Sequence, residues 1–269
     1  MAAPTPVSAL VHSSTLVTAG VYLLIRRYPM LCERDFSLGV LKCLRLFTLV
    51  MAGRVALVEV DLKKIVALST LSQLRIMLFA ISIGLPKVAF FHLITHAIFK
   101  SLLFLRAGVV IHRSLKWQDI RLLGKNWARV PVRISCITVA SLSLCGMPFL
   151  RGFYSKDLII EMRLQSGDRL IIYFMLIVGT LFTSWYSVRL GFNLFLGVNK
   201  RVSPIIHGGE SSSVKFAYGS LLFSSVVMGF LLVGLFSDLD FIAVVGNVEK
   251  FIVISLVVVA VSVIETSAK

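Results

Sequence analysis

Long runs of apolar residues, separated by short polar stretches, occupy most of this 269-residue chain. An apolar helix of roughly 20 residues crosses the hydrocarbon core of a bilayer, and inside lipid every backbone group must find its hydrogen-bond partner within the protein. The pattern therefore predicts an all-α, polytopic membrane helix bundle with about eight transmembrane segments. We expect these segments at 5–25, 36–58, 62–85, 87–111, 130–162, 170–196, 214–236 and 248–264.

The fifth expected segment, 130–162, is too long for one straight span and contains the sequence Gly146-Met147-Pro148. Proline has no backbone N–H, and its ring clashes with the carbonyl group four residues earlier, so Pro148 predicts a break in the helix. Discontinuous helices expose free backbone groups, and transporters use them where ions pass. Lys156 and Asp157 follow the break and could take part in such a site. A lysine at a helix end that reaches to the membrane surface is the alternative.

Composition supports a membrane protein. Hydrophobic side chains make up 57% of the chain and charged ones only 15%, whereas soluble domains carry about 25% charged residues. This composition excludes a disordered chain and argues against a soluble enzyme. No internal stretch has the composition of a linker, so we expect residues 1–269 to form a single transmembrane domain.

The net charge of +15 adds little about partners. Basic loops of membrane proteins lie among lipid headgroups or set topology, so we expect a lipid bilayer and no nucleic acid as partner. The four cysteines have no CxxC or His/Cys spacing and are expected to fill small apolar spaces. The chain also lacks the P-loop, GxGxxG, HExxH and GxSxG patterns, so we expect it to bind no metal and no cofactor.

Three titratable side chains share one face of the segment 87–111. His92, His96 and Lys100 follow one another at steps of four residues, which places them along one side of a helix over about 12 Å. Ionisable groups inside a bilayer are costly and therefore mark functional sites. Imidazole can accept and release a proton, and a lysine held away from water can change its charge. The spacing predicts a proton relay, and interhelical hydrogen bonds are the alternative.

A further histidine, His12, lies in the first segment and is followed by Ser13-Ser14-Thr15. Small polar residues of this kind permit close helix packing or a file of water molecules. From the residues alone, a relay histidine and a hydrogen-bonded core histidine are equally good interpretations of His12.

Four stretches in fixed order carry a resemblance to a known family. They are Pro4–Gly20 (PTPVSALVHSSTLVTAG), Asp61–Gln73 (DLKKIVALSTLSQ), Phe91–Phe104 (FHLITHAIFKSLLF) and Gly146–Asp157 (GMPFLRGFYSKD). In residue identity and order they closely resemble the antiporter-like subunit 5 of NADH:ubiquinone oxidoreductase, respiratory complex I. The match is dense from Pro4 to Gly20 and from Asp61 to about Glu161, and it is weaker beyond.

The resemblance implies a proton-translocating subunit of the membrane arm of this enzyme complex, multi-pass in the mitochondrial inner membrane and in contact with other membrane-arm subunits. NADH, flavin, iron–sulfur clusters and ubiquinone would bind to other subunits, and this chain would perform no redox chemistry. A cation/proton antiporter subunit outside complex I is one alternative, and a non-functional truncated reading frame is another. By matching positions, the relay would consist of His12, His92, His96, Lys100, Lys156 and Asp157.

Two departures from the family pattern stand out. The family has further helices before the first motif, with a glutamate and a lysine that form an input pair, and it continues after the last segment into another span and a long lateral helix. We therefore expect a truncated antiporter-like domain that lacks both parts.

The second departure is a set of arginines within or beside apolar segments, where one arginine at the membrane centre costs at least about 2.5–3.5 kcal/mol. They are Arg54, Arg75, Arg106, Arg133, Arg151 and Arg189. One hypothesis is that their codons are AGA or AGG, which some animal mitochondria read as serine. The alternative is a genuine arginine-bearing protein whose arginines pair with acids on other subunits.

Overall fold

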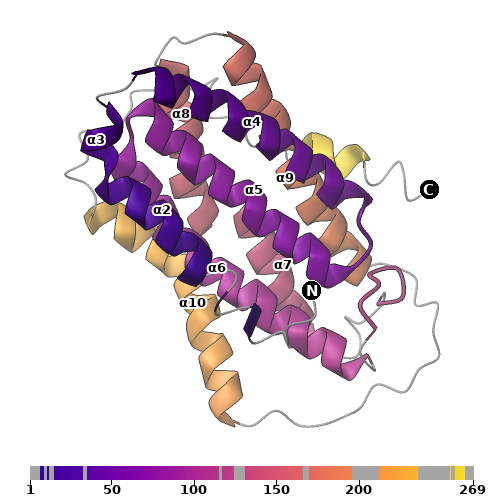
Figure 1. The fold of residues 1–269 in the computed structure, drawn as a ribbon. Helices are drawn as coiled ribbons and strands as arrows, with labels where there is room; N and C mark the ends of the chain where they lie inside the picture. Colours follow the sequence, from indigo (N-terminus) through magenta and orange to yellow (C-terminus); the bar gives the residue numbers. More distant parts are fainter. Residues whose placement is uncertain are drawn as a thin grey trace.

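The structure is a computed structural model, and all regular elements in the part of the chain that it describes are helices (Figure 1). It describes residues 7–8, 11, 15–32, 35–114, 117–123, 131–165, 170–195, 212–235, 255 and 258–263. In chain order the helices are α2 (Leu16–Arg26), α3 (Tyr28–Cys32), α4 (Asp35–Val58), α5 (Leu62–Ile83), α6 (Pro86–Arg113), α7 (Pro131–Cys145), the π turn η2 (Phe153–Asp157), α8 (Leu158–Gln165), α9 (Leu170–Phe195) and α10 (Ser212–Leu235).

The predicted segments agree with these helices where the structure describes them, and of the first segment, 5–25, α2 covers the second half. Within the described residues, three helices are apolar and long enough to cross a membrane: Leu62–Ile83, Pro86–His112 and Leu170–Leu194. The expected segments at 36–58 and 214–236 coincide with α4 and α10, which have 24 residues each. Most of the eighth expected segment lies outside the described residues. The predicted all-α membrane helix bundle is confirmed.

The connection between α5 and α6 follows directly from the sequence. Gly84 ends α5 in a left-handed conformation, with φ +99°, which glycine adopts without steric cost. Pro86 then opens α6, where its missing N–H has no helical partner to lose. This short turn lets α6 pack beside α5 in the middle of the bundle (Figure 1).

The predicted break in the fifth segment is confirmed. Helix α7 ends at Cys145, and Gly146 follows it with φ +91°. The chain then turns back, and Gly152 packs directly on α7: a Cβ atom at this glycine would lie only 1.6 Å from the carbonyl oxygen of Ser143. The π turn η2 and α8 follow. The break therefore places η2 inside the bundle, against α6 and α10.

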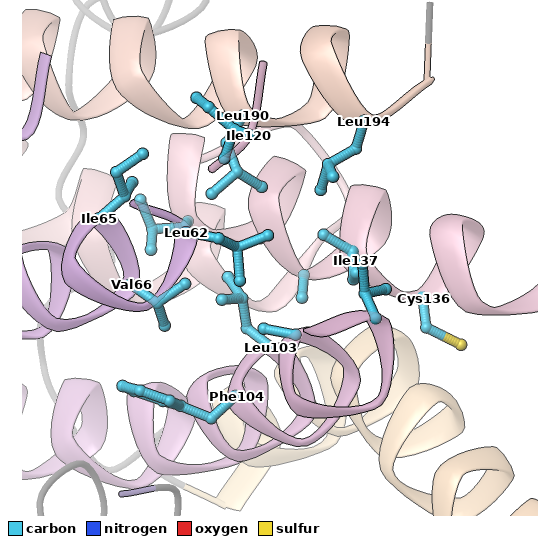
Figure 2. Packing of buried hydrophobic residues seen from close by; sticks show 14 of the residues in the cluster. Leu62, Ile65, Val66, Leu103, Phe104, Ile120, Cys136, Ile137, Leu190 and Leu194 are labelled. Atoms are coloured by element: carbon cyan, nitrogen blue, oxygen red, sulfur yellow. The ribbon is translucent and has the colours of Figure 1, made fainter. Parts of the chain in front are cut away.

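Apolar side chains from four helices form one of the two cores. Figure 2 shows this core, where α5, α6, α7 and α9 meet. The labelled residues are Leu62, Ile65, Val66, Leu103, Phe104, Ile120, Cys136, Ile137, Leu190 and Leu194. A second core joins α2, α4, α5, α6, α8 and α9.

Helices α4 and α9 approach each other through glycines. A Cβ atom on Gly53 would lie 2.7 Å from the Cβ of Phe182, and one on Gly179 would lie 2.5 Å from the side chain of Leu49. Lipid is as apolar as leucine, so membrane helices associate through such close packing and through polar contacts rather than through burial of apolar area.

The outside of the bundle is apolar. Leu44 and Phe47 of α4, Phe174 of α9, and Phe216 and Phe223 of α10 are all more than half exposed. Many of the buried side chains, in contrast, are hydroxyls, imidazoles and amines. A bundle with an apolar surface and polar groups inside is adapted to a lipid environment, and it concentrates its chemistry in the interior.

Candidate functional site

Helix α6 carries the three groups that the spacing predicts on one face. His92, His96 and Lys100 are each 1% exposed or less. The rings of the two histidines lie one helical turn apart, with their centroids separated by 6.3 Å. The predicted alignment is therefore present and faces the interior of the bundle, while the relay role of these residues stays a prediction.

Lys100 is held by helix α5. Its Nζ donates a hydrogen bond to the hydroxyl of Ser69 and another, at 3.4 Å, to the carbonyl oxygen of Val66. Ser69 donates its own hydrogen to the same carbonyl at 2.7 Å, so its oxygen is free to accept from the amine. Among the described residues no carboxylate lies within salt-bridge distance of Lys100.

His92 connects α6 with two other elements. Its Nδ1 lies 2.8 Å from the hydroxyl oxygen of Ser155 in η2, and its Nε2 lies 3.3 Å from the side-chain oxygen of Gln73 in α5. Thr95, one turn along α6, donates to the same Ser155 oxygen at 3.0 Å. Sequence reasoning did not assign roles to Ser155 and Gln73. For Ser155, the one signal in the sequence was its position directly before Lys156.

His96 differs from His92 in its contacts. Both of its ring nitrogens are buried, and neither has a hydrogen-bond partner among the described residues. Its ring packs edge-on against Phe99, with the centroids 5.3 Å apart. A buried imidazole usually has a hydrogen-bond partner on at least one nitrogen. His96 therefore differs from His92 and Lys100, because no hydrogen bond in the described structure explains why a polar residue is buried at this position.

Lys156 lies in the π turn and points to the end of α7. Its Nζ donates to the carbonyl oxygen of Cys145 at 3.2 Å and to the hydroxyl of Thr183 in α9 at 2.9 Å. The side chain is 1% exposed. The alternative interpretation, a lysine reaching to the membrane surface, is therefore not found in this structure. As with Lys100, no carboxylate in the described part of the chain pairs with it.

Asp157 follows Lys156 but does not bind it. The residue is 4% exposed, and both carboxylate oxygens are buried without a hydrogen-bond donor among the described residues. An isolated carboxylate is expensive to bury. Asp157 is therefore a second polar group in this region that no structural bond explains.

Residues predicted elsewhere have separate outcomes. His12 lies outside the described residues. Cys136 and Cys145 are buried in or at the end of α7, while Cys32 and Cys43 are exposed. The thiol of Cys145 lies 2.8 Å from the hydroxyl of Ser187, beside the Lys156 contacts. Within the described residues, no three His, Cys, Asp or Glu side chains form a group that could hold a metal.

The arginines that the sequence singled out occupy different environments. Arg151 is fully buried, and its three side-chain nitrogens have no acceptor among the described residues. Arg106 is also buried and places its guanidinium carbon 3.4 Å from the centre of the Tyr218 ring, an arrangement of the cation–π type.

Other arginines bind backbone oxygens. Arg189 donates to the carbonyl oxygens of Leu57 and Glu59 near the end of α4. Arg45, which sequence reasoning did not single out, is 5% exposed and donates to a carbonyl oxygen of α5. Of the remaining predicted set, Arg54 is exposed, Arg75 is half-buried, and the side chain of Arg133 is outside the described part.

The site as a whole consists of three polar clusters in the bundle interior. The first joins Lys100 to Ser69, the second joins His92 to Ser155, and the third joins Lys156 to Thr183. Each of these groups can hold or pass a proton, and each cluster connects helices distant in sequence. The clusters are also connected along the chain: His92 and Lys100 lie on α6, and Ser155 of the second cluster directly precedes Lys156 of the third.

Comparison with known proteins agrees with this architecture. Residues 1–183 match the family model of the NADH:quinone oxidoreductase/Mrp antiporter transmembrane region. The chain is 47% identical over 251 residues to NADH-ubiquinone oxidoreductase chain 5 of Mytilus edulis, covering 93% of this chain and 44% of that protein. It is also 47% identical over 260 residues to the chain 5 of Locusta migratoria, covering 96% of this chain and 45% of that protein. The chain thus spans somewhat less than half the length of these relatives.

A solved structure supports the same assignment. A chain of the Mrp complex from Dietzia sp. DQ12-45-1b superposes with a TM-score of 0.80 at 28% sequence identity, over 97% of this chain and 31% of that one. The family match covers most of the sequence. It includes the broken segment and the buried lysines and histidines. This chain belongs to the NADH:quinone oxidoreductase/Mrp antiporter transmembrane family.

Proposed function

We propose that this chain is the corresponding part of a proton-translocating membrane-arm subunit of NADH:ubiquinone oxidoreductase. The observation that carries the proposal is the pair of buried lysines, Lys100 and Lys156. Each is held by hydroxyl and carbonyl oxygens, and among the described residues no carboxylate lies within salt-bridge distance of either. A carboxylate would hold the charged amine firmly, whereas neutral oxygens bind it more weakly. Such a lysine is suited to gaining and losing a proton during a working cycle.

The residues between the two lysines support a path. From Lys100, the line along α6 leads to His96 and His92, and His92 is hydrogen-bonded to Ser155, the neighbour of Lys156. His96 and Asp157, which have no hydrogen-bond partners among the described residues, add two further groups that could carry a proton. In this proposal His12 joins the relay by its matching position alone.

The rest of the assignment follows from the relatives. Their animal origin supports a place in the mitochondrial inner membrane, and the name they share supports other membrane-arm subunits of the same complex as partners. As a subunit of the enzyme, the chain would contribute proton transfer, while NADH, flavin, iron–sulfur clusters and ubiquinone would bind elsewhere in the complex.

The experiment compares Lys100→Ala and Lys156→Ala in the assembled complex, reconstituted into vesicles. Both variants are expected to lower the number of protons moved per NADH oxidised and to slow the coupled reduction of quinone. Lys64→Ala is the matched control, because Lys64 is an exposed lysine that pairs with Asp61 at 3.0 Å. Pumping by both buried-lysine variants at the level of the control would refute the proposal.

A second candidate is a cation/proton antiporter subunit outside complex I, which the similarity to the Dietzia Mrp complex supports. The same buried groups would serve either complex, so they do not distinguish the two candidate functions. Purification of the chain from native membranes decides between them: NADH:quinone reductase activity in the same particle supports the first, and its absence from a particle that contains this chain supports the second.

A further inference from the structure

The contact between Ser155 and His92 forms the second polar cluster and connects η2 with α6. Many buried serines and threonines here donate to a carbonyl of their own helix; Ser82, for example, donates to Phe79 at 2.7 Å. Ser155 also lies 3.4 Å from such a carbonyl, that of Arg151, but its shorter contact, at 2.8 Å, is with a ring nitrogen of another element, and it is fully buried. Its hydroxyl therefore serves a contact that the fold of η2 alone does not require.

The hydrogens around neutral His92 can be counted. A neutral imidazole carries hydrogen on one nitrogen and a lone pair on the other. The side-chain oxygen of Gln73 can only accept, so Nε2 carries the hydrogen. Nδ1 must then accept, and the donor at this nitrogen is the hydroxyl of Ser155. Thr95 can donate to Ser155 in turn.

The same contacts also accommodate charged His92. A proton that charges the ring must arrive at Nδ1, because Nε2 already carries hydrogen. The new N–H then donates to the Ser155 oxygen, and the hydroxyl hydrogen of Ser155 turns to the carbonyl oxygen of Arg151, 3.4 Å away. The proton comes from another group of the proposed relay, whose bond to it breaks as the N–H bond at Nδ1 forms. Release of the proton reverses this step and the turn of the hydroxyl.

We propose that Ser155 is a positioning residue of the relay, whose hydroxyl donates to neutral His92, accepts from charged His92, and so permits this histidine to change its charge inside the bundle. The inference rests on the proposed function, since it assigns a role within the same proton path. It also gives the π turn a specific role, because η2 presents the Ser155 hydroxyl to α6 and the next side chain, Lys156, to α7 and α9.

The test uses Ser155→Ala, Ser155→Thr, Ser82→Ala and His92→Ala in the assembled complex in vesicles. Ser155 binds both forms of His92, so its loss changes the proton-binding equilibrium by the difference between a hydrogen bond to a charged group and one to a neutral group, which is about tenfold. Ser155→Ala is therefore expected to reduce the rate of proton translocation about tenfold. Ser155→Thr, which keeps the hydroxyl, is expected to restore it, and Ser82→Ala, with an equally small loss of buried volume, is expected to have no effect.

Three results would decide against the inference or its basis. Normal pumping by Ser155→Ala, with pumping lost in His92→Ala, would overturn the role of Ser155 and leave the relay intact. Equal loss in assembled Ser155→Ala and Ser155→Thr complexes would also overturn it, because the hydroxyl would then not be the property that matters. Normal pumping by His92→Ala would instead remove this histidine from the proposed function. If the threonine variant does not assemble, Ser155→Cys replaces it, because the thiol also carries a hydrogen.

Discussion

Replacement of Gly152 by alanine is expected to break the hydrogen bonds of Lys156, four residues further along the chain. Gly152 has an ordinary helical φ of −63°, so alanine would cause no backbone strain there. The obstacle is purely steric: the new Cβ would lie 1.6 Å from the carbonyl oxygen of Ser143, and real Cβ atoms stay at least 3.0 Å from other heavy atoms. The start of η2 and the end of α7 must therefore separate by about 1.4 Å.

This displacement is large compared with the tolerance of the Lys156 contacts. The two hydrogen bonds of Lys156 measure 2.9 and 3.2 Å, and a further 1 Å takes both beyond hydrogen-bonding distance. Overpacking costs about 1–3 kcal/mol, and a lost hydrogen bond to a charged group costs about 1.5–3 kcal/mol. Because both bonds of Lys156 are lost, we expect Gly152→Ala to reduce the stability of the folded chain by about 4–9 kcal/mol and to impair proton translocation.

The assay combines the melting temperature of the detergent-solubilised complex with the number of protons moved per NADH oxidised in vesicles. Gly219→Ala is the control, because nothing lies within 4 Å of a Cβ at this position in α10, and alanine favours a helix over glycine. The reasoning would be refuted if Gly152→Ala melted and pumped like the Gly219→Ala control.

Three smaller changes test other parts of the bundle. Arg151→Ser is expected to raise the melting temperature, because the buried guanidinium has no acceptor among the described residues and an arginine at the membrane centre costs at least about 2.5–3.5 kcal/mol. The codon hypothesis predicts serine at position 151 of the native chain, and arginine found there by mass spectrometry would refute that hypothesis. Gly53→Val should separate α4 from α9 and lower the melting temperature by an overpacking cost of about 1–3 kcal/mol. Tyr186→Phe removes the 2.9 Å hydrogen bond to Ser72 and should cost about 1 kcal/mol in an unfolding titration, without changing assembly.

Local rules were sufficient for the features that depend on neighbouring residues. The step of four between His92, His96 and Lys100 determines a common helix face, and Pro148 cannot continue a helix, so both predictions could be made without knowing the fold. Composition and segment length were likewise enough for the membrane bundle.

Features that depend on distant parts of the chain were not predictable in this way. Ser155 meets His92 across 63 residues of sequence, and Lys156 meets Thr183 across 27. The direction of these two side chains depends on the π turn, whose hydrogen-bond pattern has no reliable sequence signature. Gln73 is a similar case, because its role follows only from the packing of α5 on α6.

The position of Lys156 at the end of α7 has an electrostatic consequence. The last carbonyl groups of a helix together carry a partial negative charge of about half an elementary charge. Because the segment is broken at Cys145, one of these carbonyls is available to Lys156. The interrupted helix thus serves as a fractional counter-ion. In the proposed relay, this fractional charge is expected to favour the charged form of Lys156 less strongly than a full carboxylate would, so that the lysine can also release its proton.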